Sequence, residues 1–246
     1  QIMKSICIFG IFVADLCFFS HAIPIRGQTV LGTKHLVGPG GKGSNQAIAA
    51  ARLGGDVKFI TKLGKDNHAE MALSLYKNSG METDAIIQDP NLTTGVAGIM
   101  IDEKTGDNII NVVPGAAADL SNKDIDKKIN LIKNSKIFLT QLETPSEVTS
   151  YALNKAKESG NITILNPAPA AKINDDDFKL IDFFTPPIII LYASSQVRCN
   201  GSIVFSFFQL ICKTFDGLIF TIQQLICFAP RTMTFLESVL SIHKNQ

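Results

Sequence analysis

The sequence has no tryptophan, only three tyrosines and few charges, since charged residues make up 18% of its 246 positions. Lysine and arginine number 23 against 22 aspartates and glutamates, which gives a formal net charge of +1. A balance this close to zero provides no basic field for nucleic acid or for a membrane surface. We therefore expect a small neutral or anionic ligand, no nucleic acid and no membrane.

Cysteine is also scarce, and no two cysteines form a CxxC pair. A disulfide framework and a structural zinc site are both disfavoured by this spacing, and we expect no metal site made of cysteines. The pattern favours reduced thiols in the cytoplasm, with the nucleus as a second location. The five residues concerned are Cys7, Cys17, Cys199, Cys212 and Cys227.

The beginning of the chain allows two interpretations. After Lys4, the stretch SICIFGIFVADLCFFSHA has the charge, short apolar run and small-residue exit of a secretory signal over residues 1–22. Asp15 interrupts that run, and a glycine cluster follows at a distance suited to a first buried strand. We favour a strand from Ser5 to Val13, and the signal peptide stays open as the alternative.

From Ser5 to about Pro186, short β-branched runs alternate with helical periods. This alternation predicts an α/β fold with a mostly parallel sheet covered on both faces. Residues 56–64 and 136–143 are expected strands, and residues 66–80 an expected helix that stops at Gly80. The capping-box pattern TPSE after the second strand predicts a helix capped by Thr144 and leaves Glu143 at the strand's carboxyl end.

One segment departs from the alternation. Residues 93–113 contain two extended runs around Glu103 to Asp107, with Gly106 in the turn, and therefore predict a β-hairpin. A hairpin inserted into an α/β chain is a candidate lid. The segment from about 17 to 37, rich in turn residues and short extended pieces, is expected to pair with it.

The last sixty residues have a different composition. They hold six charged residues and seven of the 16 phenylalanines. Their apolar runs IVFSFFQLIC and GLIFTIQQLICFA are each shorter than the roughly 18 residues that a membrane span needs. The sequence predicts no architecture for residues 187–246, and we treat residues 1–186 and 187–246 as separate parts.

The richest motif is GPGGKGSNQAIAAARLG, residues 38–54. Tandem glycines let backbone approach a ligand closely and turn N–H groups toward it, and a helix amino end follows. The spacing fits neither a Walker loop nor a dinucleotide fingerprint. One cation and one amide in a bare loop suit the hydroxyls of a sugar, while a plain glycine-rich turn before a surface helix is equally compatible.

Several motifs occur in a fixed order: FVADL, GGKGSNQAIAAARLGG, TTGVAGIMID, VVPGAAADLS, TQLETP and LNPAPA. Over about residues 3–186 this series resembles the ribokinase-type (PfkB) carbohydrate kinases, and its GGKGSNQ and NPAPA forms resemble the ribokinase branch. The resemblance implies a three-layer αβα, Rossmann-like fold with a small β lid, and a homodimer formed through the lid. It implies phosphorylation of D-ribose to ribose 5-phosphate with ATP and Mg²⁺, with K⁺ as a further ion.

The resemblance also implies site residues. Asp15 and Glu143 would accept hydrogen bonds from sugar hydroxyls, and the glycine loop would line the sugar with donors. Without the resemblance, Asp15 is an ordinary loop aspartate and Glu143 a carboxylate near a positive helix end. The substrate-binding residues it implies are Asp15, Gly40, Gly41, Lys42, Gly43, Asn45 and Glu143.

The sequence departs from the family pattern in three places. Val13 stands where the family usually has an asparagine two residues before the aspartate. The Gly-Ala-Gly-Asp stretch with the family's base is absent, so no catalytic residue is assigned, and the Asn-x-x-Glu after TP is missing. We interpret residues after Pro186 as a foreign or truncated end, such as an alternative exon. The alternative function is a non-catalytic product that retains only sugar binding or lid-mediated dimerisation.

Overall fold

The fold is built around β1 (Ser5–Phe9), which lies inside a parallel sheet. In this computed structural model, which describes residues 5–185 and the backbone of residues 203–205 and 226–228, β1 pairs in parallel with a strand on each side. Cys7, Ile8 and Phe9 are buried on alternating faces, as a central strand of a doubly covered sheet requires. The parallel strands are β4 (Asp56–Ile60), β1, β9 (Ile137–Thr140), β10 (Ile162–Leu165) and β11 (Phe183–Phe184).

Two short strands continue this sheet beyond β11. β13 (Ile226–Phe228) pairs antiparallel with β11, and β12 (Ile203–Phe205) pairs antiparallel with β13. The strand order is therefore β12-β13-β11-β10-β9-β1-β4. The rest of the segment 187–246, including the interpretation of a foreign end, lies outside the described residues.

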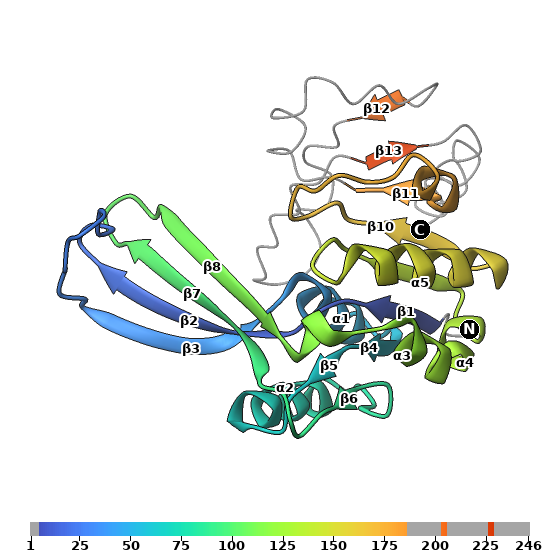
Figure 1. Cartoon of the computed structure of the whole chain (residues 1–246), viewed down its shortest axis with the longest axis horizontal. Helices are drawn as coiled ribbons and strands as arrows, with labels where there is room; N and C mark the ends of the chain where they lie inside the picture. Colours follow the sequence, from blue (N-terminus) through green and yellow to red (C-terminus); the bar gives the residue numbers. More distant parts are fainter. Residues whose placement is uncertain (1–4, 186–202, 206–225, 229–246) are drawn as a thin grey trace, which may run out of the picture.

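Helices cover both faces of this sheet, which makes three layers (Figure 1). Ile8 belongs to a buried cluster with residues of α1 (Lys42–Arg52) and α2 (Asn67–Asn78). Cys7 and Phe9 belong to a cluster on the other face, with residues of α3 (Asn122–Lys127), α4 (Ile129–Lys133) and α5 (Ser146–Glu158). Alternate residues of one strand thus support two opposite cores, and the predicted αβα architecture is confirmed.

A second sheet, which we call the small sheet, projects from this body as an arm (Figure 1). It contains β2 (Val13–Ser20), β3 (Lys34–Gly40), β7 (Thr94–Asp102) and β8 (Asn108–Gly115), in the order β3-β2-β7-β8. The hairpin turn contains Gly106 with a φ of 78°, as its sequence predicts. A two-stranded sheet of β5 (Lys62–Leu63) and β6 (Ile87–Gln88) lies before β7 in the chain.

Three local predictions differ from the structure. The expected strand over residues 56–64 is divided into β4 and β5, which belong to different sheets. The expected strand from Ser5 to Val13 ends at Phe9, and after three residues the chain enters the small sheet at Val13. The helix after Glu143 is not capped by Thr144: Pro145 occupies the N-cap position and makes no side-chain cap. The Thr144 hydroxyl instead lies 2.6 Å from the hydroxyl of Thr149, which removes it from capping.

The described helices are short. None of those between residues 5 and 185 is long and apolar enough to cross a membrane.

Candidate functional site

The glycine loop joins the end of the small sheet to the first helix of the body. β3 ends at Gly40, Gly41 occupies the N-cap position of α1 with a φ of 91°, and α1 begins at Lys42. That φ lies in the region that only glycine adopts without strain. Gly41 therefore lets the chain turn sharply from sheet to helix, as the tandem glycines predict.

Gly40 is bare because a carboxylate of the protein lies against it. A β-carbon at Gly40 would overlap the carboxylate of Asp15, which comes from the neighbouring strand β2. Gly38 lies two residues earlier on the same strand, and a β-carbon there would meet nothing within 4 Å. The sequence predicts that a ligand approaches the backbone of this loop closely. At Gly40, the group that lies against the backbone is the carboxylate of Asp15.

Lys42 and Glu143 are joined by two contacts. Oε2 of Glu143 accepts a hydrogen bond of 2.8 Å from the backbone N–H of Lys42, and Oε1 accepts one of 2.8 Å from its Nζ. The Glu143 side chain is 9% exposed and that of Lys42 is 41% exposed. Because α1 has no side-chain cap of its own, Glu143 supplies an acceptor at its amino end from another element.

The electrostatics of Asp15 link it to this pair. Burial raises the pKa of its carboxyl, the negative charge of Glu143 raises that pKa further, and the positive charge of Lys42 partly offsets both. The three side chains form one charged group, which we call the Asp15 cluster. Two carboxylates that accept and one ammonium that donates match the hydroxyl groups of a polyol.

The other expected site residues have different positions. Gly43 is buried, and a β-carbon there would lie 2.8 Å from the Cα of Gly10, so this glycine serves the packing of α1 on the end of β1. Asn45 is exposed in the first turns of α1. Gly41 is partly buried. The structure thus brings Asp15, Gly40, Lys42 and Glu143 into contact, while Gly43 and Asn45 lie in the adjoining first turn of α1.

Sequence reasoning missed Gln141, which is 1% exposed beside the same loop. Its Nε2 donates to Oε1 of Gln46 on α1, and its own Oε1 is buried without a partner among the described residues. That oxygen would be 2.9 Å from a β-carbon on Gly43. Its sequence position could have identified it, because Gln141 lies two residues before Glu143, at the carboxyl end of β9.

Two more buried oxygens without partners follow the carboxyl ends of sheet strands, within residues 5–185. Oγ1 of Thr61 comes directly after β4, and Oδ1 of Asn166 directly after β10. The carboxyl ends of parallel strands share one edge of the sheet, where open α/β folds bind ligands. This edge therefore carries polar atoms beyond the Asp15 cluster.

A metal site built from protein side chains alone is not found among the described residues. Between residues 5 and 185 no group of three or more His, Cys, Asp or Glu side chains is placed to hold a metal. Of the two carboxylates in the Asp15 cluster, Glu143 already binds Lys42 on both oxygens. The chemistry of the Asp15 cluster is therefore that of hydrogen bonds and charge, without a metal ligand set.

Comparison with known proteins identifies similar chains. Residues 3–186 match the pfkB family carbohydrate kinase domain. A bifunctional ribokinase/ribose-5-phosphate isomerase A of Fructilactobacillus sanfranciscensis is 40% identical over 185 residues, 75% of this chain and 34% of that protein. The ribokinase of Bacillus subtilis is 35% identical over 184 residues, 75% of this chain and 62% of that protein.

A solved structure has the same arrangement. The ribokinase of Thermotoga maritima superimposes with a TM-score of 0.70 at 34% identity, over 78% of this chain and 62% of that one. The structure of Arabidopsis thaliana ribokinase complexed with ribose and ATP gives 0.70 at 26% identity, over 77% and 62% of the two chains. The chain thus spans less than two thirds of the length of each of these relatives.

Proposed function

Because the chain belongs to the pfkB family of carbohydrate kinases, we propose that it acts as a ribokinase, in the ATP-dependent phosphorylation of D-ribose to ribose 5-phosphate. Relatives named ribokinase at 35–40% identity support the reaction class. The observation that carries the proposal is the Asp15 carboxylate lying against bare Gly40, beside the Lys42–Glu143 pair. None of the comparisons favours the alternative of a chain that only binds sugar.

The Asp15 cluster would bind the sugar through its hydroxyl groups. Asp15 and Glu143 would accept from hydroxyl donors, and the Lys42 ammonium would donate to a hydroxyl oxygen. Charge-assisted hydrogen bonds of this kind are short and directional, so they would fix the orientation of the ring as well as hold it. The small sheet, which carries Asp15, would act as a lid over the sugar.

ATP is the proposed phosphoryl donor, with Mg²⁺ and a K⁺ ion as further partners. The similar Arabidopsis thaliana ribokinase, solved in complex with ribose and ATP, supports ATP as the donor. The residues that would hold the nucleotide and its metal are not assigned among those described. The intracellular location expected from the unpaired thiols, two of which are the described Cys7 and Cys17, remains a prediction.

The proposal is tested by measuring ribose-dependent ADP release, with a calorimetric titration of ribose beside it. Ribose binding with turnover supports it, whereas ribose binding without ADP release contradicts it and favours the non-catalytic alternative. Asp15→Ala is expected to abolish ribose binding. An unchanged affinity would mean that the sugar lies elsewhere.

Val13 favours a second candidate sugar. It lies on the same face of β2 as Asp15, two residues earlier, and is 3% exposed. The side chain of valine makes no hydrogen bond to a hydroxyl. A pentose that lacks one hydroxyl therefore loses less binding free energy here than it would at a polar site. Titration with 2-deoxyribose beside ribose decides between them: tighter binding of the deoxy sugar favours this candidate, and tighter binding of ribose excludes it.

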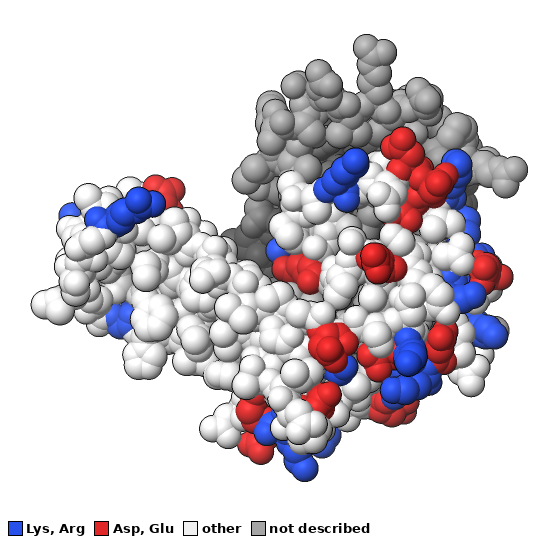
Figure 2. Space-filling view, viewed as in Figure 1, with Lys and Arg blue, Asp and Glu red and all other residues white. Residues whose placement is uncertain are grey.

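The small sheet is also the proposed dimer contact. Exposed apolar side chains occur on both of its faces, including Leu36 and Ile110 on the Asp15 face and Phe18 and Ile109 on the other. Figure 2 shows little charge on the arm between its tip and the body. Apolar patches of this kind mark interaction sites. Sedimentation of the chain should show a dimer that Ile109→Asp or Ile110→Asp dissociates, and a monomeric parent chain would contradict this.

A further inference from the structure

The angle between the small sheet and the body determines the shape of the Asp15 cluster. Asp15 lies on β2 in the small sheet, whereas Lys42 and Glu143 lie on the body, in α1 and after β9. A rotation of the sheet therefore changes the distance between Asp15 and its two charged neighbours. The residues that hold the base of the small sheet against the body therefore also determine these distances.

The base of the hairpin is a close crossing of backbone on backbone. Thr94 at the start of β7 is paired with Gly115 at the end of β8. Gly115 has a φ of 57°, and a β-carbon there would lie 2.7 Å from the amide nitrogen of Gly95. At this pair the backbones of β7 and β8 are in direct contact, and residues on either side of it tie the hairpin to the body.

One restraint acts where the hairpin begins. Oδ2 of Asp66 accepts a hydrogen bond of 2.7 Å from the backbone N–H of Thr94, while its Oδ1 accepts one of 2.9 Å from Ala69 N–H and so caps α2. The Thr94 hydroxyl accepts a hydrogen bond of 3.0 Å from Gly64 N–H. The start of β7 is thereby tied to a helix of the body.

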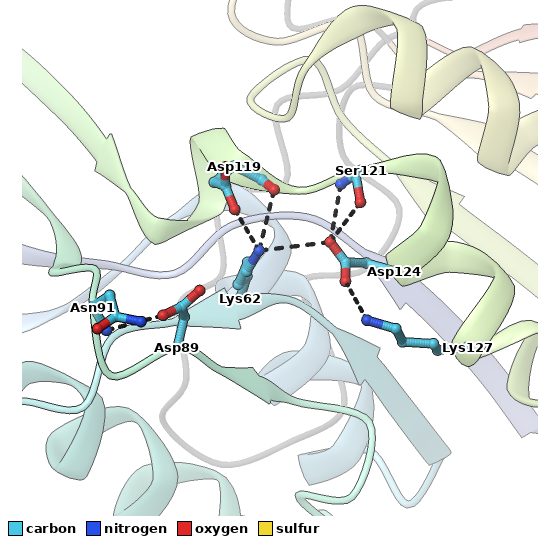
Figure 3. Close-up of polar contacts among 7 residues, drawn as sticks. All are labelled: Lys62, Asp89, Asn91, Asp119, Ser121, Asp124 and Lys127. Carbon is cyan, nitrogen blue, oxygen red and sulfur yellow. Dashed lines mark hydrogen bonds and ion pairs between the residues drawn. The ribbon is translucent and has the colours of Figure 1, made fainter.

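The other restraint is Lys62, which reaches the segment where the hairpin ends (Figure 3). Its side chain is 8% exposed. Its Nζ lies 2.6 Å from Oδ2 of Asp119 and 3.2 Å from the backbone oxygen of the same residue, four positions after Gly115. It lies 3.6 Å from Oδ2 of Asp124, which is 7% exposed and completes the capping box of α3 with the N-cap residue Ser121.

Lys62 stays charged in this position. Burial acts to lower the pKa of its ammonium, but the hydrogen bond to Asp119 and the charges of Asp124, Asp119 and Asp89 outweigh burial and leave that pKa raised. Asp89 accepts from the backbone N–H of Asn91, in the turn that leads to β7 (Figure 3). The buried cation is thus surrounded by carboxylates from both ends of the hairpin.

A buried ion pair contributes little to stability compared with an apolar packing of the same volume, and its better attested use is to specify one arrangement. We propose that Lys62 is a positioning residue for the sugar site: it holds the segment after β8 through Asp119 and Asp124 and so keeps the small sheet at one angle to the body. The expected effect of Lys62 on ribose affinity rests on the proposed function, whereas its expected effect on the angle of the small sheet does not.

The test compares four variants. Lys62→Met removes the charge and keeps the volume, Lys62→Arg keeps the charge, and Asp119→Asn weakens the contact at a side chain that is 63% exposed and tolerant of change. Lys127→Met is the matched control: Lys127 also contacts Asp124, at 3.4 Å, but is 71% exposed and does not contact the hairpin end. If Lys62→Met fails to fold, Asp119→Asn carries the test.

The first measurement needs no sugar. Spin labels introduced through unnatural amino acids at Lys104, in the hairpin turn, and at Leu53, at the end of α1, report the angle as a distance distribution in samples diluted with unlabelled protein. Lys62→Met and Asp119→Asn should broaden this distribution, while Lys62→Arg and Lys127→Met should not. Unchanged distributions in Lys62→Met and Asp119→Asn would overturn the proposal.

The second measurement is ribose affinity. If the correct angle is populated about one tenth of the time in Lys62→Met, the apparent dissociation constant rises about tenfold, with kcat at saturating ribose nearly unchanged. A fall in kcat without a change in affinity would also overturn the proposal. If the parent chain binds no ribose but the distance distribution broadens as expected, the proposed sugar fails and the positioning role of Lys62 stands.

Discussion

The backbone N–H and the ammonium group of Lys42 each lie 2.8 Å from a different carboxylate oxygen of Glu143. One acidic side chain therefore satisfies the amino end of α1 and neutralises the only cation of the glycine loop. The sequence predicts a sugar contact for both partners of this pair. Their contact with each other ties the start of α1 to the segment after β9.

Glu143→Gln should weaken this anchor. The amide retains one acceptor oxygen for the Lys42 N–H but loses the charge that pairs with the ammonium, so we expect a loss of about 1–3 kcal/mol in the free energy of unfolding. Urea denaturation measures it. Glu147→Gln, at an exposed carboxylate in the first turn of α5, is the control and should change stability by less than about 0.5 kcal/mol. Equal effects of both variants would contradict the anchoring role.

Gly40→Ala should displace Asp15. The added β-carbon overlaps the Asp15 carboxylate, so either this side chain or strand β3 must move, at a cost of about 1–3 kcal/mol. Ribose affinity should fall together with stability. Gly38→Ala is a matched control on the same strand, because its β-carbon meets nothing within 4 Å. Titration calorimetry on both variants gives the comparison, and retained affinity in Gly40→Ala would argue against Asp15 as a sugar contact.

A rise in pH that ionises Asp15 should strengthen ribose binding and lower the free energy of unfolding. The pKa of Asp15 in the folded chain is raised above its usual value of about 3.9, first by burial and then by the charge of Glu143. A raised carboxyl pKa means that its contribution to stability is full below the unfolded pKa and is lost as pH rises through the folded pKa. If Asp15 accepts hydrogen bonds from the sugar as proposed, ribose binding uses the charged form and should strengthen over that same rise.

Asp15→Asn isolates this effect. The difference in unfolding free energy between the parent chain and Asp15→Asn should favour the parent more at acidic than at neutral pH. Calorimetric titrations of ribose across this range give the binding part. An affinity that stays constant as pH falls through the raised pKa would show that the charge of Asp15 does not take part in binding.

Tyr76→Phe should reduce stability without affecting the sugar. Tyr76 is fully buried on α2, packs edge-on against Phe12 and Phe59, and its hydroxyl donates a hydrogen bond of 2.9 Å to Ser44 Oγ on α1. Removing the hydroxyl leaves a buried serine without this partner, at a cost of about 1–2 kcal/mol. Thermal unfolding measures the loss. A tenfold change in ribose affinity would show instead that the contact shapes the pocket.

The elements that the sequence predicts correctly are those with a local signal. The alternating pattern of residues 5–185 indicates the layered sheet, and Gly106 between two extended runs indicates the hairpin that the structure contains. The glycine loop indicates a sharp turn into a helix, and Gly41 makes it with a positive φ. In each case the backbone requirement of one residue type is enough to limit the structure.

What the sequence does not predict depends on distant partners. Lys62 lies in β5, and no local pattern marks it as buried; only the return of the chain at Asp119 and Asp124 explains its burial. Gln141 has no local signal of its contact, because its partner Gln46 is 95 residues away. Such choices are decided by tertiary contacts that no local pattern contains.

The contact between Lys42 and Glu143 spans 101 residues, and this separation has a consequence for biosynthesis. At about 5–20 residues per second, a ribosome needs roughly 5–20 s to extend the chain from one partner to the other. During that interval α1 has emerged without the acceptor for its first amide. The Asp15 cluster is therefore completed only after β9 and Glu143 have been synthesised, and nascent chains released before β9 carry the glycine loop unanchored.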